Sequence, residues 1–389
     1  MNFDEWIERG EDSEKWQGAK EKGELALWVA DMDFACSDAI VQALHQRVDE
    51  RIYGYTNGMD EDYKRCVQAY YQRHFDWQIP LEDLFFSQGI VQGISLLLQI
   101  LSKDGDGIVI QTPVYHPFRR KILANHRVCV ESSLIHHPDG SYEMDLKDLK
   151  EKLSSPEVAG MILCSPHNPV GRVWKSEELK AVCEIAKECH KWIISDEIHC
   201  DIVKEGFVHH PLETIAPEYK EEIITCVAPT KTFNIAGVEC SHIILHKEAY
   251  KKRWQEYVID QLCISAPNCF ALRASKAAYS DSDEWRAKMN ETIDANERYV
   301  RAFLEKELPA AILSPREGTY LLWLDLSAYE SDPQRLQQRL REHARLHFNE
   351  GIMFGKEGTC FERINIACPL TILQEACERL ASELKKERN

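Results

Sequence analysis

The sequence lacks several motifs that identify common classes of binding site. Its 14 cysteines include no C-x-x-C pair, so neither a redox motif nor a zinc ribbon is predicted, and we expect no metal. Neither a G-x-G-x-x-G fingerprint nor a Walker A motif is present, which disfavours a plain nucleotide-binding module. No apolar run approaches the length of a membrane span, so the sequence does not predict a membrane protein.

Positive charge is also scarce. The 389 residues hold 47 Lys and Arg against 64 Asp and Glu, which gives a formal net charge of −17. Such acidity argues against nucleic acid or an anionic membrane as a partner, and ordinary solubility is the preferred explanation for it. The first six residues show no basic n-region or apolar h-region, and cysteines such as Cys164 and Cys226 lie inside apolar runs. We therefore expect a cytoplasmic protein.

The hydrophobic pattern predicts an α/β fold. From Phe85 onwards, short apolar strands alternate with amphipathic helices, among them a helix over about 177–190 with Ser176 as its N-cap. This alternation predicts a mainly parallel sheet flanked by helices. Beyond about residue 285, a long charged helix and further short elements predict a smaller α+β domain. The expected division is an N-terminal arm that also forms part of the small domain, a large domain, and a C-terminal small domain: 1–48, 49–284 and 285–389.

One lysine is the most informative residue of the chain. Lys231 lies between Thr230 and Thr232, directly after the apolar run 223–227, which is typical of a buried strand. Lysine is strongly hydrated and is rarely found at the inner end of such a strand. One explanation is a Schiff base, formed by an amine in a dry pocket beside hydroxyls that bind phosphate. A lysine that extends to the surface is the commoner case when this residue is taken alone.

Three further strand ends carry unusual groups. The segment 89–91 opens a helix, where backbone N–H groups can bind phosphate, although an ordinary tight turn is equally consistent. Asn168 lies between two prolines, and its amide could bind a cofactor, a substrate or its own backbone. Asp196 ends an apolar strand and needs a cationic partner, which a protonated pyridine nitrogen or a structural ion pair would supply. Ligands of open α/β sheets bind beyond the carboxyl ends of the strands, so these groups are expected to converge.

A fourth group comes from the predicted small domain. Arg363 lies near a strand, and its planar guanidinium suits the α-carboxylate of an amino acid. A surface salt bridge is the commoner role of an arginine, and it remains an alternative here.

These segments, in this order, resemble pyridoxal-phosphate-dependent aminotransferases of fold type I over nearly the whole chain. Within that superfamily the likeness is strongest to the MalY/PatB-type cystathionine β-lyases, also called C–S lyases. The Ala-Asp-Met-Asp-Phe segment over 30–34 distinguishes this group from ordinary aminotransferases. The matching segments are 29–34, 53–56, 112–115, 164–171, 195–199, 231–235 and 319–325.

The resemblance implies a large domain with a mainly parallel sheet, a smaller α+β domain, and a homodimer with shared active sites. It implies that Lys231 binds pyridoxal 5′-phosphate and acts as the base, that Asp196 pairs with the ring nitrogen, and that Tyr115 stacks on the ring. The other implied cofactor-binding residues are Gly89, Ile90, Val91, Asn168, His199, Thr230 and Tyr55, the last serving the other subunit. The implied substrate-binding residues are Arg363, Ala30 and Asn168.

His199 departs from the classical aminotransferase pattern, in which many enzymes carry a tyrosine three residues after the aspartate. A structural histidine and a cofactor contact are equally consistent with the sequence.

The resemblance implies α,β-elimination of L-cystathionine or a related cysteine thioether to a thiol, pyruvate and ammonia, within methionine biosynthesis. A transamination at the same site is the alternative reaction. A regulatory protein that binds a transcription factor is an alternative of another class, although no DNA-binding motif is present. The sequence does not identify the thioether or the acid that protonates the leaving thiolate.

Overall fold

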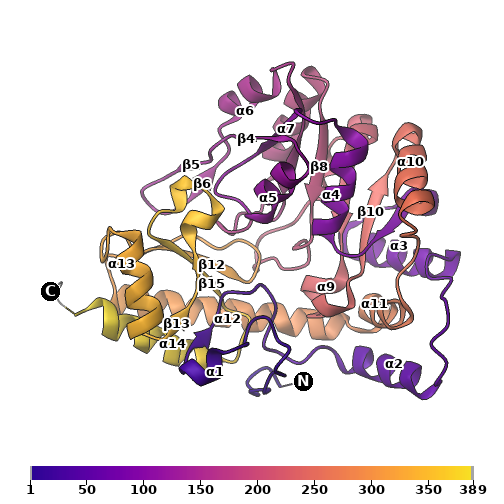
Figure 1. The fold of residues 1–389 in the computed structure, drawn as a ribbon. Coiled ribbons are helices and arrows are strands. Elements are labelled where there is room, and N and C mark those ends of the chain that lie inside the picture. Colours follow the sequence, from indigo (N-terminus) through magenta and orange to yellow (C-terminus); the bar gives the residue numbers. More distant parts are fainter. Residues whose placement is uncertain (1, 387–389) are drawn as a thin grey trace.

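The computed structural model describes residues 2–386 (Figure 1). At the centre of this part of the chain lies a seven-stranded sheet with the order β2-β10-β9-β8-β7-β3-β4. β10 is antiparallel to both of its neighbours, whereas the other strands run in one direction, so the predicted mainly parallel sheet is confirmed. The strands are β2 (Leu84–Ser87), β3 (Gly107–Ile110), β4 (Val128–Glu131), β7 (Val158–Cys164), β8 (Trp192–Asp196), β9 (Ile223–Val227) and β10 (Ser241–Leu245).

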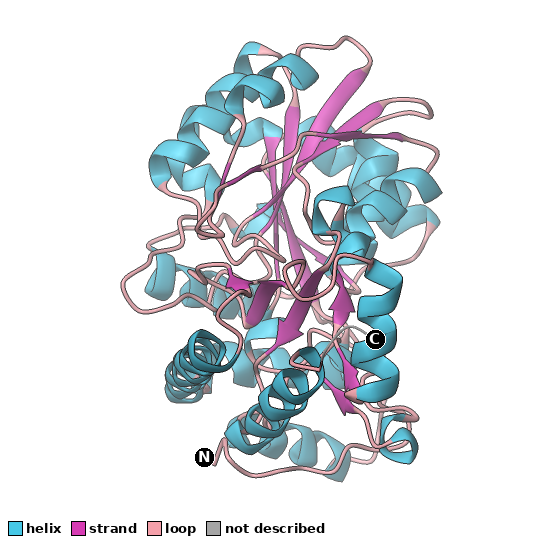
Figure 2. Cartoon of the chain, turned by 90° about the vertical axis from the view of Figure 1, so that its left-hand side faces the viewer, coloured by secondary structure: helices cyan, strands magenta, loops and turns pink. Residues whose placement is uncertain are grey.

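Helices cover both faces of this sheet (Figure 2). The inner strands are buried along their whole length and are mostly apolar because both of their faces are covered, as in β8 and β9, where all residues are buried. The helices of this part are α2 (Asp38–Asp49), α3 (Glu61–Phe75), α4 (Ile90–Leu101), α5 (Pro117–Ala124), α6 (Leu146–Leu153), α7 (Ser176–Glu188), α8 (Leu212–Ile215), α9 (Pro229–Thr232), α10 (Glu248–Trp254) and α11 (Cys269–Asp281).

The C-terminal part is built on α12 (Asp283–Glu307), a long helix that runs beneath both parts of the molecule (Figure 1). Within the described residues it leads to a four-stranded antiparallel sheet with the order β11-β12-β15-β14. The remaining elements here are β11 (Ile312–Leu313), β12 (Leu321–Asp325), α13 (Pro333–Gln338), β13 (Leu346–His347), β14 (Asn349–Glu350), β15 (Phe361–Asn365) and α14 (Leu370–Leu384). None of the helices between residues 2 and 386 has both the length and the apolar character needed to cross a membrane.

The N-terminal arm belongs spatially with the C-terminal part. β1 (Leu25–Ala26) pairs in parallel with β13, so two segments from opposite ends of the sequence lie side by side. The arm also contains the short helix α1 (Ala19–Lys22). A small hairpin of β5 (Ile135–His136) and β6 (Tyr142–Glu143) completes the strands of the described chain.

Two helix boundaries differ from the predictions. Ser176, the predicted N-cap of α7, is instead the first helical residue, and Lys175 occupies the N-cap position. The Glu178 carboxylate accepts a 2.9 Å hydrogen bond from the Lys175 backbone N–H, and this bond satisfies the helix end without a serine cap. The sequence also predicts a helix over 334–343, but this segment is α-helical only to Gln338 and continues as a π-helical turn.

A close contact between β7 and β8 generates a prediction about stability. A Cβ at Gly160 would lie 2.3 Å from Trp192 Cδ2, in a fully packed layer. We therefore expect Gly160→Ala to lower the free energy of unfolding by about 1–3 kcal/mol, measured by urea denaturation. Gly237→Ala is the matched control because nothing lies within 4 Å of the position that its added methyl group would take. Equal stability of the two variants would contradict this packing.

Candidate active site

A cavity of about 230 Å³ lies beyond the carboxyl ends of the parallel strands. It collects groups from the segments that follow β2, β3, β7, β8 and β9, because parallel strands end at the same edge of a sheet. The structure brings most of the predicted site residues to its wall: Ala30, Gly89, Ile90, Val91, Tyr115, Asn168, Asp196, His199, Thr230 and Lys231. Arg363 and Tyr55 are the predicted residues that do not line it.

Lys231 is held by the short helix α9, which follows β9 directly. Its Nζ donates a hydrogen bond to the Ala30 carbonyl oxygen. Burial lowers the pKa of Lys231 to about 8, an effect that Asp31 opposes and Arg363 reinforces. A lysine with this pKa has a much larger neutral fraction near physiological pH than an ordinary lysine, and the neutral amine is the form that acts as nucleophile or base.

Asp196, at the end of β8, is only 4% exposed. Its Oδ1 accepts a 3.1 Å hydrogen bond from the Ile198 backbone N–H, and no ion pair to this carboxylate is formed within residues 2–386. Burial raises the pKa of Asp196 to about 7. The structural ion pair that the sequence also allows for this residue is therefore not formed, and the carboxylate is suited to a cationic ligand.

The start of α4 provides an anion site in the same cavity. Gly89 precedes the helix with φ of 101°, a conformation that favours glycine. Its N–H donates to Ser241 Oγ at 3.1 Å, whereas Ile90 and Val91 occupy the first helical positions, whose N–H groups have no partner within the helix. Together with the Thr230 hydroxyl, these groups are chemically suited to a phosphate.

Arg363, on β15, is buried among neutral partners. It donates to the Trp28 carbonyl oxygen at 2.8 Å and to Asn168 Oδ1 at 3.1 Å, and it also bonds Asn349 Oδ1. Its guanidinium lies 4.9 Å from the centre of the Phe354 ring, and its Nε is buried without a partner among the described residues. The alternative of a surface salt bridge is therefore wrong. Burial lowers the pKa of this guanidinium to about 10, so it remains charged at neutral pH.

His199 is buried and neutral, because burial lowers its pKa to about 3 and Lys231 and Arg363 add to that effect. Its ring packs edge-on against Tyr320 at 5.6 Å, and its Nδ1 has no hydrogen-bond partner within the described residues. Both explanations of this residue therefore remain open. Tyr115 also lines the cavity, and its ring packs edge-on against Phe118 at 5.6 Å.

Tyr55 lies outside the 230 Å³ cavity and is fully exposed. It lines a neighbouring cavity of about 620 Å³, and Gln88 and Glu239 line both cavities. Within one chain Tyr55 therefore does not reach the candidate site, although it lies next to it.

Two residues that complete the site are absent from the sequence-based prediction. Tyr320 donates a 2.8 Å hydrogen bond to the Ala30 carbonyl oxygen, beside Lys231, and its only sequence signal is that its segment matches the family. Asn349 binds Arg363 because β14 pairs with β15 and places the two residues opposite each other. An isolated asparagine carries no sequence signal for this role.

No group of three or more His, Cys, Asp or Glu side chains within residues 2–386 is placed to hold a metal ion.

Comparison with known proteins identifies the family of the chain. The family model "Aminotransferase class I and II" matches residues 23–380. Cystathionine beta-lyase PatB of Bacillus subtilis is 36% identical over 389 residues, which cover 99% of this chain and 100% of PatB.

Two solved structures are also similar. The PLP-bound C–S lyase of Staphylococcus hominis has a TM-score of 0.93 and 34% identity, and the match covers 99% of this chain and 98% of that one. Cystalysin of Treponema denticola, which contains a pyridoxal 5′-phosphate cofactor, has a TM-score of 0.94, 32% identity and the same coverage. The chain belongs to the class I and II aminotransferase family, in the group of MalY/PatB-type C–S lyases.

The environment of Lys231 predicts its reactivity in cofactor-free protein. Because burial lowers the pKa of this amine to about 8 from 10.5, the reactive neutral form appears as the pH rises through about 8. We expect labelling of Lys231 by an amine-reactive reagent, followed by peptide mass spectrometry, to have its midpoint there. An exposed lysine such as Lys20 is the internal control. A Lys231 midpoint near 10.5 would contradict the buried environment.

Proposed function

We propose that this protein is a pyridoxal 5′-phosphate-dependent carbon–sulfur β-lyase that cleaves L-cystathionine or a related cysteine thioether to a thiol, pyruvate and ammonia. The observation that carries the proposal is the convergence of the Lys231 amine, the unpaired Asp196 carboxylate and the start of α4 on one cavity. The likeness to named cystathionine β-lyases and C–S lyases supports the choice of reaction.

The residues of the cavity fit this cofactor. Lys231 would bind the aldehyde carbon of the cofactor. Asp196 would pair with the protonated ring nitrogen, whose positive charge would compensate the charge of the buried carboxylate. The first N–H groups of α4 and the Thr230 hydroxyl would hold the phosphate, and Tyr115 would cover one face of the ring. Asn168 and His199 would contact the ring from the side of its hydroxyl group. The bound cofactor supplies an electron sink for the substrate Cα.

Arg363 would bind the α-carboxylate of the amino-acid substrate. Its charge is buried, and in the described residues it bonds neutral groups alone, so a substrate carboxylate would provide the missing countercharge. Asn168 and Asn349 hold the guanidinium in place, and the backbone near Ala30 would contact the same carboxylate. This fixed carboxylate sets which bond of Cα is broken.

Lys231 would then act as the base. Its lowered pKa increases the neutral fraction of the free amine, and the neutral amine can take the Cα proton. The Ala30 carbonyl oxygen accepts a hydrogen bond from Nζ and stabilises the protonated amine. The C–S bond breaks with its electron pair on sulfur, and the thiolate takes a proton from Lys231 or from a tyrosine such as Tyr115. Addition of water to the remaining three-carbon unit yields pyruvate and ammonia.

A product assay tests the proposed reaction. We expect cofactor-loaded protein to release pyruvate and free thiol in equal amounts from L-cystathionine, without an added keto acid. Lys231→Ala should lose both the visible absorption of the lysine-bound cofactor and the turnover, by about 10³-fold or more, because the anchor and the base are one residue.

The same assay distinguishes the alternatives. Turnover that requires a keto acid and releases neither pyruvate nor thiol would identify an aminotransferase. A colourless protein that does not bind the cofactor would contradict the proposal as a whole.

Arg363→Lys tests the carboxylate site. Lysine keeps the charge but loses the planar pair of N–H donors and the contacts to Asn168 and Asn349. We expect kcat/KM for L-cystathionine to fall by about 10²-fold, with unchanged cofactor absorption. Arg335→Lys, at a half-exposed arginine on α13, is the matched control. Wild-type kcat/KM in Arg363→Lys would exclude Arg363 from the carboxylate site.

We propose a homodimer in which Tyr55 reaches the phosphate of the partner's cofactor. The support is a cluster of exposed apolar side chains around it, with Ile52 77% and Tyr53 53% exposed, beside the 620 Å³ cavity. We also propose a division of the chain into 1–48, 49–284 and 285–389, a cytoplasmic location and a place in methionine biosynthesis.

A further inference from the structure

The Ala30 carbonyl oxygen is the hydrogen-bond acceptor of the reactive Lys231 amine. It accepts hydrogen bonds from Lys231 Nζ and from the Tyr320 hydroxyl, at 2.8 Å for the latter. Ala30 lies in an irregular segment, residues 28–34, so regular secondary structure does not fix its position. The groups that hold this segment therefore determine where the amine of Lys231 lies.

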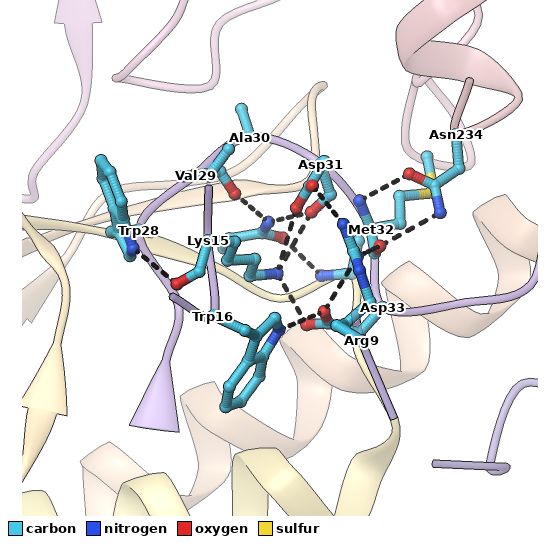
Figure 3. Close-up of polar contacts among 12 residues, drawn as sticks. Arg9, Lys15, Trp16, Trp28, Val29, Ala30, Asp31, Met32, Asp33 and Asn234 are labelled. Atoms are coloured by element: carbon cyan, nitrogen blue, oxygen red, sulfur yellow. Dashed lines mark hydrogen bonds and ion pairs between the residues drawn. The ribbon is translucent and has the colours of Figure 1, made fainter. Parts of the chain in front are cut away.

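Two asparagines bind the backbone of this segment, and Figure 3 shows the contacts of Asn234. Asn365 Nδ2 donates to the carbonyl oxygens of Val29 and Asp31, at 2.7 and 2.6 Å, and so brackets Ala30 on both sides. Asn234, three residues after Lys231, donates to the Met32 carbonyl at 3.1 Å and accepts from its N–H at 2.9 Å.

A lysine of the N-terminal arm also holds the segment (Figure 3). The Lys15 side chain is completely buried, and its Nζ lies 2.6 Å from Asp33 Oδ2 and 3.6 Å from Asp31 Oδ1. The same Nζ donates to the Asp31 carbonyl oxygen at 3.2 Å. Lys15 therefore bonds the peptide group that directly follows the one holding the Ala30 carbonyl.

The two acidic residues of the segment are matched by two cations of the arm. Arg9 lies 2.7 Å from Asp31 and 3.4 Å from Asp33. Trp16 Nε1 also donates to Asp33 Oδ1 at 2.8 Å. A buried ion pair is a costly means of stabilising a fold, because apolar residues of similar size would serve as well or better. The directed contact from Lys15 to the Asp31 carbonyl is what an apolar pair could not provide.

We propose that Lys15 is a positioning residue for the lyase reaction: its ammonium group, bound to Asp33 and to the Asp31 carbonyl, holds the Ala30 carbonyl at the amine of Lys231. The inference rests on the proposed function for its catalytic consequence, but the position of the amine can be measured without any turnover. The N-terminal arm is thereby part of the active site, although none of its described residues up to Trp28 lines the cavity.

Lys15→Met removes the ammonium group and keeps the length of the side chain. In cofactor-free protein at a pH of about 8, we expect Lys231 to be labelled by an amine-reactive reagent about three- to tenfold faster, as loss of one hydrogen bond implies. Hydrogen exchange of the backbone amides over 29–34 should rise in parallel. In the loaded enzyme, kcat should fall by about ten- to hundredfold, with KM changed by less than about threefold.

A second variant separates positioning from stability. Lys15→Met combined with Asp33→Asn removes the buried carboxylate that Lys15→Met leaves with Arg9, at 3.4 Å, as its cationic partner. The new amide oxygen can still accept from Trp16, so stability should recover. The Asp31 carbonyl still lacks the hydrogen bond from Lys15 and keeps only the one from Asn365, so fast labelling of Lys231 and low kcat should persist. Lys20→Met, at an exposed lysine of the same arm paired with Glu8, is the control and should behave as wild type.

The two possible failures are distinguishable. Recovery of wild-type labelling and kcat in the double variant would show that Lys15 acts through stability alone and would overturn the inference. Wild-type labelling and exchange in Lys15→Met would overturn it as well. Failure of wild-type protein to release pyruvate and thiol would instead contradict the proposed function. The labelling and hydrogen-exchange measurements on cofactor-free protein would then still decide whether Lys15 positions the Lys231 amine.

Discussion

The active site depends on one interaction, the hydrogen bond from the buried Lys231 amine to the Ala30 carbonyl oxygen. It joins the segment after β9 to the N-terminal segment, and Tyr320, just before β12, binds the same oxygen. Three segments that are distant in the sequence therefore meet at one atom. Burial lowers the pKa of the Lys231 amine, so a larger fraction of it is neutral at a given pH. The hydrogen bond to Ala30 defines the position of the amine when no cofactor is bound to it.

The two other charged groups of the site are incompletely compensated within the described chain. Burial raises the pKa of Asp196 to about 7 and lowers that of Arg363 to about 10, so both charges lack a strong partner. A ligand with a cationic ring nitrogen would stabilise the first, and a carboxylate would stabilise the second. An amino acid bound to pyridoxal 5′-phosphate carries both groups. The charge distribution therefore favours the proposed cofactor and substrate class over a neutral ligand.

Much of the architecture is predictable because apolar runs and turn residues are local signals. β9 covers the predicted run 223–227, and α4 begins within the predicted segment 89–91. The groups at these ends converge because parallel strands end at one edge of a sheet. What escapes prediction depends on tertiary contacts. The partnership of Asn349 with Arg363 arises from strand register, and the burial of Lys15 arises in an arm whose polar composition suggests solvent exposure. The prediction of Ser176 as a cap is wrong because a glutamate bonds the backbone at that helix end.

The central claim is that Lys231 carries the cofactor. The most direct measurement is reduction of the cofactor-loaded protein with borohydride, followed by peptide mass spectrometry to locate the attached pyridoxyl group. We expect a single modified peptide, with the added mass on Lys231, and no such peptide when the cofactor is removed before reduction. Modification of another lysine, or of none, would show that Lys231 does not carry the cofactor.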